Sequence, residues 1–296
     1  MTPDDMISAL EAGGQHRVLR RLRARKVVNT RGDGEEVKLG LALDLETTGF
    51  DPLHDEIIEL AILPFTFSAD GMIFEIENGY ASLRQPTIPI PREITALTGL
   101  DDKTVAGHTI DLAKVSALVD AASLIIAHHA GFDRPFAERL LPVFASKCWA
   151  CSMSDINWHE EGIESAKLAW ILNQYGIFYD SHRATVDCHA LIEIMVHILP
   201  KSSEAGLSKI LKAARSPTWR VWAMNSPFDT KDILKKRGYK WSPGENHWPK
   251  SWYIDGDDDI KETEISFLKS DIYRRDINLR VDKFTAFDRF SERVTP

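Results

Sequence analysis

The 296-residue sequence has only three cysteines. An odd and small number cannot build a disulfide framework, which excludes a secreted, disulfide-stapled scaffold and favours a reducing compartment. No apolar run approaches the ~18 residues that a membrane helix needs. The N-terminal MTPDDMISALEAGG is acidic, whereas a secretory signal is basic and then apolar. We therefore expect a cytoplasmic protein with no membrane partner.

The sequence also lacks the usual glycine-rich nucleotide-binding loops. Neither G-x-x-x-x-G-K nor G-x-G-x-x-G occurs, which excludes the P-loop and the dinucleotide-binding fingerprint. No repeat of fixed period is visible, so a solenoid or propeller is not expected. Hydrophobic residues make up 44% and charged residues 27%, ordinary values for a globular protein of one large or two ordinary domains.

Positive charge is scarce in the middle of the chain. Residues 41–200 hold 9 Lys and Arg against 23 Asp and Glu, whereas residues 201–296 hold 19 against 15. Residues 1–37 form a basic N-terminal extension, with seven basic residues and no acid from Arg17 to Arg31. That extension is compatible with phosphate contacts or with an amphipathic helix packed through Val18, Leu19 and Leu22.

Residues 38–200 show the hydrophobic pattern of a mixed α/β domain. Strands are expected over 40–46, 57–67, 72–83 and 123–128, and helices over 110–122, 132–142, 165–176 and 185–199. Residues 201–215 connect this domain to a small, basic, Trp-rich α+β domain and tail over 216–296. Five of the eight tryptophans lie in one stretch of that second domain: Trp219, Trp222, Trp241, Trp248 and Trp252.

The first chemical signal is the pair Asp44 and Glu46, at the end of the first predicted strand. Side chains at i and i+2 of a strand point to the same face, so the two carboxylates converge. Two carboxylates held this close repel each other unless a cation lies between them. Hard cations such as Mg²⁺ or Mn²⁺ prefer oxygen ligands of this type. A D-x-E pair alone is common, so the signal needs support.

Support comes from Phe132-Asp133, which follows a buried strand, and from His182 to Asp187, before the last helix. Each alone also fits an ordinary acid at a helix N-terminus. In order and spacing, Asp44, Glu46, Asp133, His182 and Asp187 together resemble the DEDDh branch of the DnaQ-like 3′-to-5′ exonucleases over about residues 39–199. Further matches are Thr47-Thr48-Gly49, 57–61, 94–100, Tyr175-Gly176-Ile177, Ala184, Ala190 and Glu193. His129 departs from the family, many of whose members carry Asn there.

The resemblance implies a ribonuclease-H-like fold, with a mixed five-stranded sheet flanked by helices. It implies that Asp44, Glu46, Asp133 and Asp187 bind two divalent cations, Mg²⁺ or Mn²⁺. Two such cations about 3.5–4 Å apart stabilise the attacking and leaving oxygens of a phosphodiester together. His182 would accept the proton of the attacking water.

Substrate contacts are expected around the first acids and before Asp133. The residues are Leu45, Thr47, Thr48, Gly49, Phe50, His129 and Phe132. Small residues in a turn let a terminal nucleotide approach the backbone, and Phe50 and Phe132 suit base stacking, although a core role fits them equally.

The tail allows two interpretations. Aromatics between cations suit single-stranded nucleic acid, with Lys231, Lys235, Lys236, Arg237 and Lys240 as candidate contacts. Alternatively, Trp222, Trp241 and Trp252 form the core of a small domain.

We therefore predict a metal-dependent 3′-to-5′ exonuclease that releases nucleoside 5′-monophosphates from single-stranded DNA in repair or processing. One alternative is an exoribonuclease of the same fold, because discrimination rests on contacts to one 2′-OH. The other is a non-catalytic nucleic-acid- or polymerase-binding protein, against which the five intact positions argue. The partner is nucleic acid with a free 3′ end, and the oligomeric state stays open.

Overall fold

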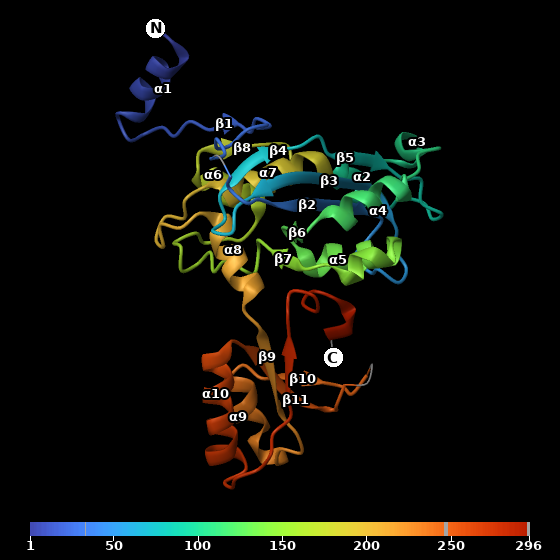
Figure 1. Ribbon diagram of the computed structural model, residues 1–296, viewed down its shortest axis with the longest axis vertical. Coiled ribbons are helices and arrows are strands. Elements are labelled where there is room, and N and C mark those ends of the chain that lie inside the picture. Colours follow the sequence, from blue (N-terminus) through green and yellow to red (C-terminus); the bar gives the residue numbers. More distant parts are fainter. Residues whose placement is uncertain (33, 246–247, 295–296) are drawn as a thin grey trace. The chain divides into compact units, whose positions relative to one another are not determined.

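The computed structural model describes residues 1–32, 34–245 and 248–294 (Figure 1). The chain divides into two compact units, Met1–Leu211 and Lys212–Pro296. The division falls inside the 201–215 segment, where the composition changes, and the basic N-terminal extension belongs to the first unit. Within the described part of the chain, no helix is both long enough and apolar enough to span a bilayer.

A six-stranded mixed sheet forms the centre of the first unit, which confirms the predicted fold class. The strand order is β4-β3-β2-β6-β7, with β5 also paired to β3. β2 runs antiparallel to β3 and parallel to β6, and β6 runs parallel to β7. The strands are β2 (Lys38–Thr47), β3 (Ile57–Phe67), β4 (Ile73–Ile76), β5 (Tyr80–Leu83), β6 (Leu124–Ala127) and β7 (Trp149–Cys151).

The sheet has six strands where the resemblance implied five, because the single strand expected over 72–83 is broken. β4 and β5 pair with different parts of the long β3, Ile76 opposite Phe65 and Tyr80 opposite Ile62. Gly79 lies in the break, and a Cβ there would come within 2.4 Å of the Ile62 carbonyl oxygen. Glycine is therefore required at this point. The three-residue β7 was not predicted, because so short a strand shows no periodicity.

β2 carries the first acids into the middle of the molecule. Leu41, Ala42 and Leu43 are fully buried, as expected for a central strand covered on both faces. Two helices pack on this region, α7 (Ala184–Val196) against β2 and β3, and α5 (Ala130–Leu140) against β2, β6 and β7. Both helices were predicted, and each begins at one of the remaining acidic motifs.

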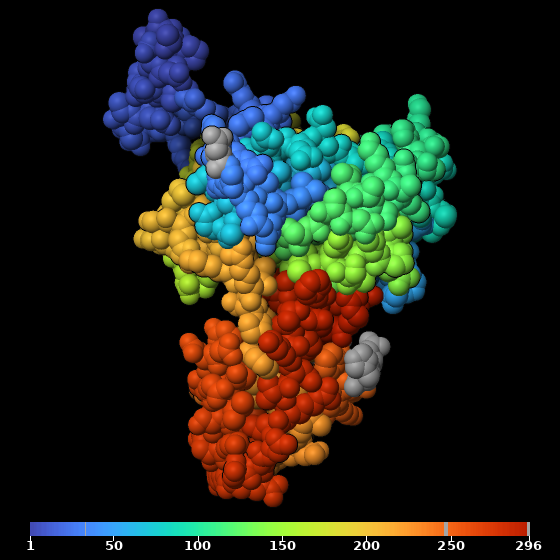
Figure 2. Space-filling view, viewed as in Figure 1, coloured from blue at the N-terminus to red at the C-terminus, as the bar shows by residue number. Residues whose placement is uncertain are grey.

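The other helices of the first unit surround this arrangement. The predicted α4 and α6 are present. The surrounding elements are α1 (Pro3–Glu11), α2 (Arg92–Thr98), α3 (Asp102–Val105), α4 (Leu112–Ala121), the 3₁₀ turn η1 (Pro142–Ser146) and α6 (Leu168–Gln174). The division between the two units falls inside α8 (Gly206–Arg215). α1 has no buried residue and forms the blue N-terminal surface in Figure 2.

The arm after α1 is extended, so the alternative of an amphipathic helix is wrong. β1 (Arg20–Arg21) pairs in parallel with β8 (Ile177–Phe178). The Arg20 N–H donates to the Gly176 carbonyl and the Leu22 N–H to the Phe178 carbonyl, both at 2.8 Å. Arg21 pairs with Asp180 at 2.6 Å, and Arg25 makes two bonds of 2.8 and 2.7 Å to the buried Glu193. These arginines thus attach the arm to the rest of the first unit.

The second unit is an antiparallel four-stranded sheet of order β10-β11-β9-β12. Trp222 and Trp248 stack at 5.6 Å in its core beside Tyr253 and Phe284. Its elements are β9 (Thr218–Ala223), η2 (Phe228–Thr230), α9 (Lys231–Lys236), β10 (Lys240–Ser242), β11 (Ser251–Gly256), α10 (Asp258–Phe267), the π-helical turn η3 (Leu268–Ile272), β12 (Val281–Phe284) and η4 (Glu292–Val294).

The core assignment of Trp241 is wrong. Trp241 is 48% exposed, whereas Trp222 is fully buried and Trp252 is partly buried. β10 is an edge strand whose side chains alternate between faces, and the buried position next to Trp241 is taken by Ser242. Trp248 takes the core position instead.

Candidate active site

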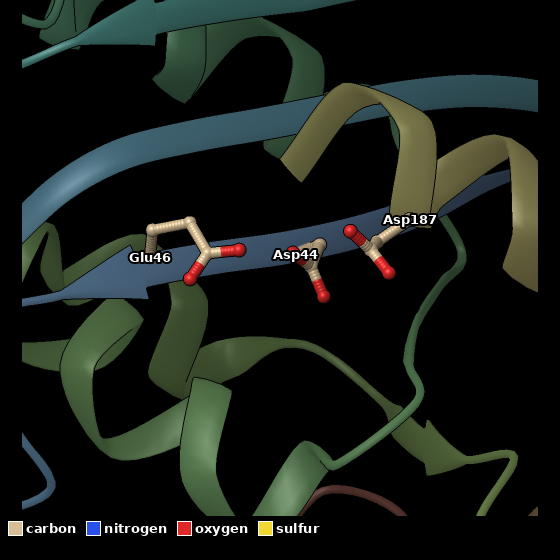
Figure 3. Close-up of side chains that lie close together, drawn as sticks. All are labelled: Asp44, Glu46 and Asp187. Atoms are coloured by element: carbon tan, nitrogen blue, oxygen red, sulfur yellow. The ribbon is translucent and has the colours of Figure 1, made fainter. Parts of the chain in front are cut away.

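Three carboxylates converge where β2 meets the first turn of α7. Asp44 and Glu46 project from β2, and Asp187 reaches them from α7 (Figure 3). One carboxylate oxygen of each residue lies within 4.8 Å of the others. The i, i+2 spacing therefore brings Asp44 and Glu46 together on β2, as the sequence predicted. The fold adds Asp187, which lies more than 140 residues further along the chain.

Asp133 lies close by but is not one of the three mutually close carboxylates. It stands in the first turn of α5 and is 2% exposed. Burial raises the pKa of Asp133 well above its usual value, while the backbone N–H of Leu45 stabilises its charge. Its own charge in turn raises the pKa of Asp44. The structure thus brings all four predicted acids into one electrostatic group.

The cluster is electrostatically unfavourable without a cation. Burial, followed by the charges of Asp187 and Glu59, raises the pKa of Glu46 to about 8. Burial and the neighbouring carboxylates also raise the pKa of Asp44 well above its usual range. Every close ligand atom is a hard oxygen, so the residues fit a divalent cation such as Mg²⁺ or Mn²⁺.

Asp187 is held in place by two hydrogen bonds. The Tyr179 hydroxyl donates to Oδ1 at 2.9 Å, and the backbone N–H of Arg183 donates to Oδ2 at 3.0 Å. Burial raises the pKa of Asp187, and these two donors partly offset it. Tyr179 could not be predicted from the sequence, because a tyrosine eight residues before Asp187 belongs to none of the acidic motifs.

An ion pair links the motif before α7 to the neighbouring strand. The Arg183 guanidinium bonds to the buried Glu59 of β3 at 3.2 and 3.3 Å, and the Ala184 N–H lies 3.3 Å from the same carboxylate. Glu59 stands opposite Glu46 in the sheet. The charge of Arg183 lowers the pKa of Glu46, against the larger effect of burial. Both residues lie inside motifs that the sequence had marked, but their pairing was not predicted.

His182 stands beside Asp187 in a strained backbone conformation. Its φ of 66° is in the left-handed region, which a histidine rarely adopts. Such strain persists where the surroundings fix the backbone, and it clusters at functional sites. The Arg183–Glu59 pair and the Arg183 N–H bond to Asp187 are the contacts that fix it. The charge of His182 lowers the pKa of Asp187, so the two side chains interact.

Hydrogen bonds among its own polar groups hold the turn that follows Asp44 and Glu46. The hydroxyl of the buried Thr48 bonds to Asp55 at 3.0 Å and accepts the Glu56 N–H at 2.9 Å. A Cβ on Gly49 would lie 2.4 Å from the Asp55 carboxylate, so a larger residue there would displace a side chain that bonds to Thr48 and to the Asp51 N–H. Leu45 and Thr47 are also buried. These side chains shape the turn, and the exposed residue that it presents is Phe50.

Phe50 and Phe132 form an aromatic pair at the site. Phe50 is 80% exposed, and its ring meets that of Phe132 edge-on at 6.0 Å. His129 stacks on the other side of Phe132 at 6.1 Å. Phe50 is therefore not in the core, whereas Phe132 is partly buried and lies 5.1 Å from the ring of the buried Phe136.

The predicted basic contacts of the second unit differ in their surroundings. Arg237 bonds to Glu264 at 2.8 Å and lies 4.0 Å from the centre of the Phe267 ring. Lys231 lies 4.3 Å above the ring of the exposed Phe228. The Arg237 guanidinium thus has a structural partner, and the exposed Lys235, Lys236 and Lys240 lie on α9 and β10.

Comparison with known proteins gives the class of this fold and site. Residues 41–195 match the RNase_T family, described as an exonuclease family. This match covers more than half of the chain and includes all five predicted catalytic positions. The chain belongs to this exonuclease family.

Individual relatives are more distant. The chain is 30% identical over 171 residues to a PolC-type DNA polymerase III of Clostridium perfringens, which covers 55% of this chain and 11% of the polymerase. A PolC-type enzyme of Caldanaerobacter subterraneus is 27% identical over 183 residues, covering 57% and 12%. The chain thus spans about a tenth of the length of the curated relatives it matches.

Two solved structures of E. coli exonuclease I share the fold. One is a zinc-bound complex with single-stranded DNA and the other a complex with a dA16 oligonucleotide. Each has a TM-score of 0.51 and 13% identity, and covers 74% of this chain and 63% of exonuclease I.

Proposed function

We propose that this protein is a metal-dependent 3′-to-5′ exonuclease that hydrolyses single-stranded DNA to nucleoside 5′-monophosphates. The convergence of Asp44, Glu46 and Asp187 inside an exonuclease-family domain carries the proposal. DNA is favoured over RNA because the relatives are DNA polymerases and the neighbouring structures hold single-stranded DNA. A role in DNA repair or processing follows from that substrate.

Asp44, Glu46 and Asp187 would hold one divalent cation, and Asp44 with Asp133 a second. Bound cations, Mg²⁺ or Mn²⁺, supply positive charge for the phosphate and make a water molecule more acidic. The protein contributes the arrangement of the acids. The Tyr179 hydroxyl and the Arg183 N–H fix the orientation of the Asp187 carboxylate, and such outer contacts matter almost as much as the ligands themselves.

His182 would take the proton from the attacking water. An imidazole is suited to this near neutral pH, and the effect of His182 on the pKa of Asp187 supports a position of the two residues at one site. Phe50 and Phe132 would hold the terminal bases at the mouth of the site by stacking.

Labelled oligonucleotides test the proposal. Single-stranded DNA and RNA of matched sequence, labelled at the 5′ end, are incubated with Mn²⁺, Mg²⁺ or EDTA. We expect a ladder of progressively shortened 5′-labelled DNA that depends on the metal and is absent with Asp44→Asn. Preferential cleavage of RNA would favour the exoribonuclease alternative. Binding of DNA without cleavage under any metal would favour the non-catalytic alternative.

A further inference from the structure

The second unit has a pocket of its own, unrelated to the carboxylate cluster. It encloses about 320 Å³, within the usual range for small-ligand sites. It is formed by the end of β9, the turn leading to α9, and strands β10 and β11. The lining residues are Ala223, Asn225, Ser226, Pro227, Phe228, Lys231, Trp241, Lys250, Ser251 and Trp252.

Three aromatic side chains line this pocket, and two of them are exposed. Phe228 is 81% exposed and Trp241 is 48% exposed, whereas Trp222 and Trp248 fill the core of the same unit. Trp241 stands opposite Trp252 in the sheet, and the two rings meet edge-on at 5.4 Å. Folding therefore does not require Trp241 or Phe228 to be aromatic. Two exposed aromatic rings at one pocket indicate a ligand.

The charge of the lining is positive. Lys231 and Lys250 line the pocket, and no acidic side chain is among its lining residues. The exposed Lys240 adjoins Trp241 on the edge strand. The nearby acids Asp229 and Asp232 are exposed on η2 and α9 and do not line the pocket. A ligand that combines flat rings with negative charge complements this lining.

We propose that this pocket binds bases of single-stranded nucleic acid, with Phe228 and Trp241 as stacking surfaces and Lys231 and Lys250 at the adjoining phosphates. Base stacking on aromatic side chains beside cations is the general chemistry of such sites. Among the described residues that line the pocket, none is Leu, Ile, Val or Met, the usual anchors of a peptide groove. The proposal rests on the proposed function, since the captured strand is the substrate of the nuclease.

Binding of labelled oligonucleotides to the full chain in EDTA tests the pocket, because cleavage is then suppressed. The probes are oligo-dT of about 30 nucleotides and an abasic oligomer of the same length, which keeps the phosphates and lacks the bases. The variants are Phe228→Ala and Trp241→Ala. Trp170→Ala is the matched control, because Trp170 is 44% exposed but lies on α6 of the first unit.

We expect each pocket variant to weaken binding of oligo-dT about tenfold, the usual effect of removing one stacked base. Binding of the abasic oligomer should stay the same in these variants, and Trp170→Ala should bind both probes like the wild type. Lys250→Ala should weaken binding of both probes. It should also reduce the magnitude of the slope of log affinity against log salt by about one, the value for one lost phosphate contact. Lys269→Ala, which removes the partner of Asp276, is its control.

Wild-type affinity for oligo-dT in both aromatic variants would overturn the proposal and leave the pocket as a protein-docking surface. Equal losses on the abasic oligomer would also overturn it, because the rings would then not be reading bases. Cleavage of a dinucleotide separates the two proposals. If it persists while oligo-dT binding is insensitive to the pocket, only the pocket proposal fails. If it is absent with every metal while binding depends on the rings, only the nuclease proposal fails.

Discussion

Replacing Glu46 by glutamine should stabilise the metal-free protein at alkaline pH. The folded protein raises the pKa of Glu46 from 4.5 to about 8. Below pH 4.5 the side chain is protonated in the folded and unfolded states, and its ionisation costs nothing. As the pH rises from 4.5 to 8, the unfolded state loses this proton and the folded state keeps it, so the free energy of unfolding falls. Above pH 8 this loss of stability is constant. At about 1.36 kcal/mol per pH unit, it reaches on the order of 5 kcal/mol.

The assay is urea unfolding in EDTA at pH 5 and pH 8.5. Wild-type stability should be lower at pH 8.5 by several kcal/mol. Glu46→Gln should remove the part that Glu46 contributes, and the raised pKa values of Asp44, Asp133 and Asp187 should keep the rest of the difference. Glu75→Gln, at an exposed position on β4, is the control and should change neither value. Mn²⁺ should restore the wild type at pH 8.5 because it neutralises the cluster. If Glu46→Gln shows the same pH dependence as the wild type, the carboxylates do not repel one another as argued.

Three further predictions concern the surroundings of the cluster. His182→Ala should lower single-turnover cleavage about 10²-fold with unchanged Mn²⁺ affinity by calorimetry, and an unaltered rate at every pH would exclude a proton-transfer role. Tyr179→Phe should weaken Mn²⁺ binding or cleavage at least tenfold, because Asp187 loses a donor; wild-type values for both would refute this. Burial raises the pKa of Glu193, but bonds from His197 and Arg25 outweigh it and lower that pKa to about 2. Arg25→Ala should therefore cost about 2 kcal/mol at pH 7, a loss that disappears between pH 4.5 and 2 in urea titrations, and a constant loss would contradict it.

The sequence predicted those parts of the site that depend on local spacing. Asp44 and Glu46 share a strand face because strand periodicity is two, and Asp187 lies in the first turn of a helix that the apolar pattern predicted. The convergence of these acids came from the family resemblance, because spacing alone does not place β2 beside α7.

Long-range contacts of single side chains were not predictable. The Arg183–Glu59 pair joins residues 124 positions apart, and neither sits in a pattern that names the other. Trp241 was misjudged because tryptophan is usually buried, and only the pairing of β10 at the sheet edge turns it outward. The conformation of the N-terminal arm stayed open between two alternatives, because its partner strand β8 has two residues and no periodicity of its own.

The two units differ in net charge, and this difference connects the proposed nuclease site with the proposed base-binding pocket. Residues 212–296 hold 17 Lys and Arg against 14 Asp and Glu, and residues 1–211 hold 19 against 30. A polyanion is repelled by the acidic first unit until cations neutralise the carboxylate cluster, whereas the second unit attracts it at all times. Under both proposals, joining the two units in one chain would raise the concentration of the strand near the carboxylate cluster. The advantage should therefore grow with strand length and vanish for a dinucleotide, which engages only the catalytic unit.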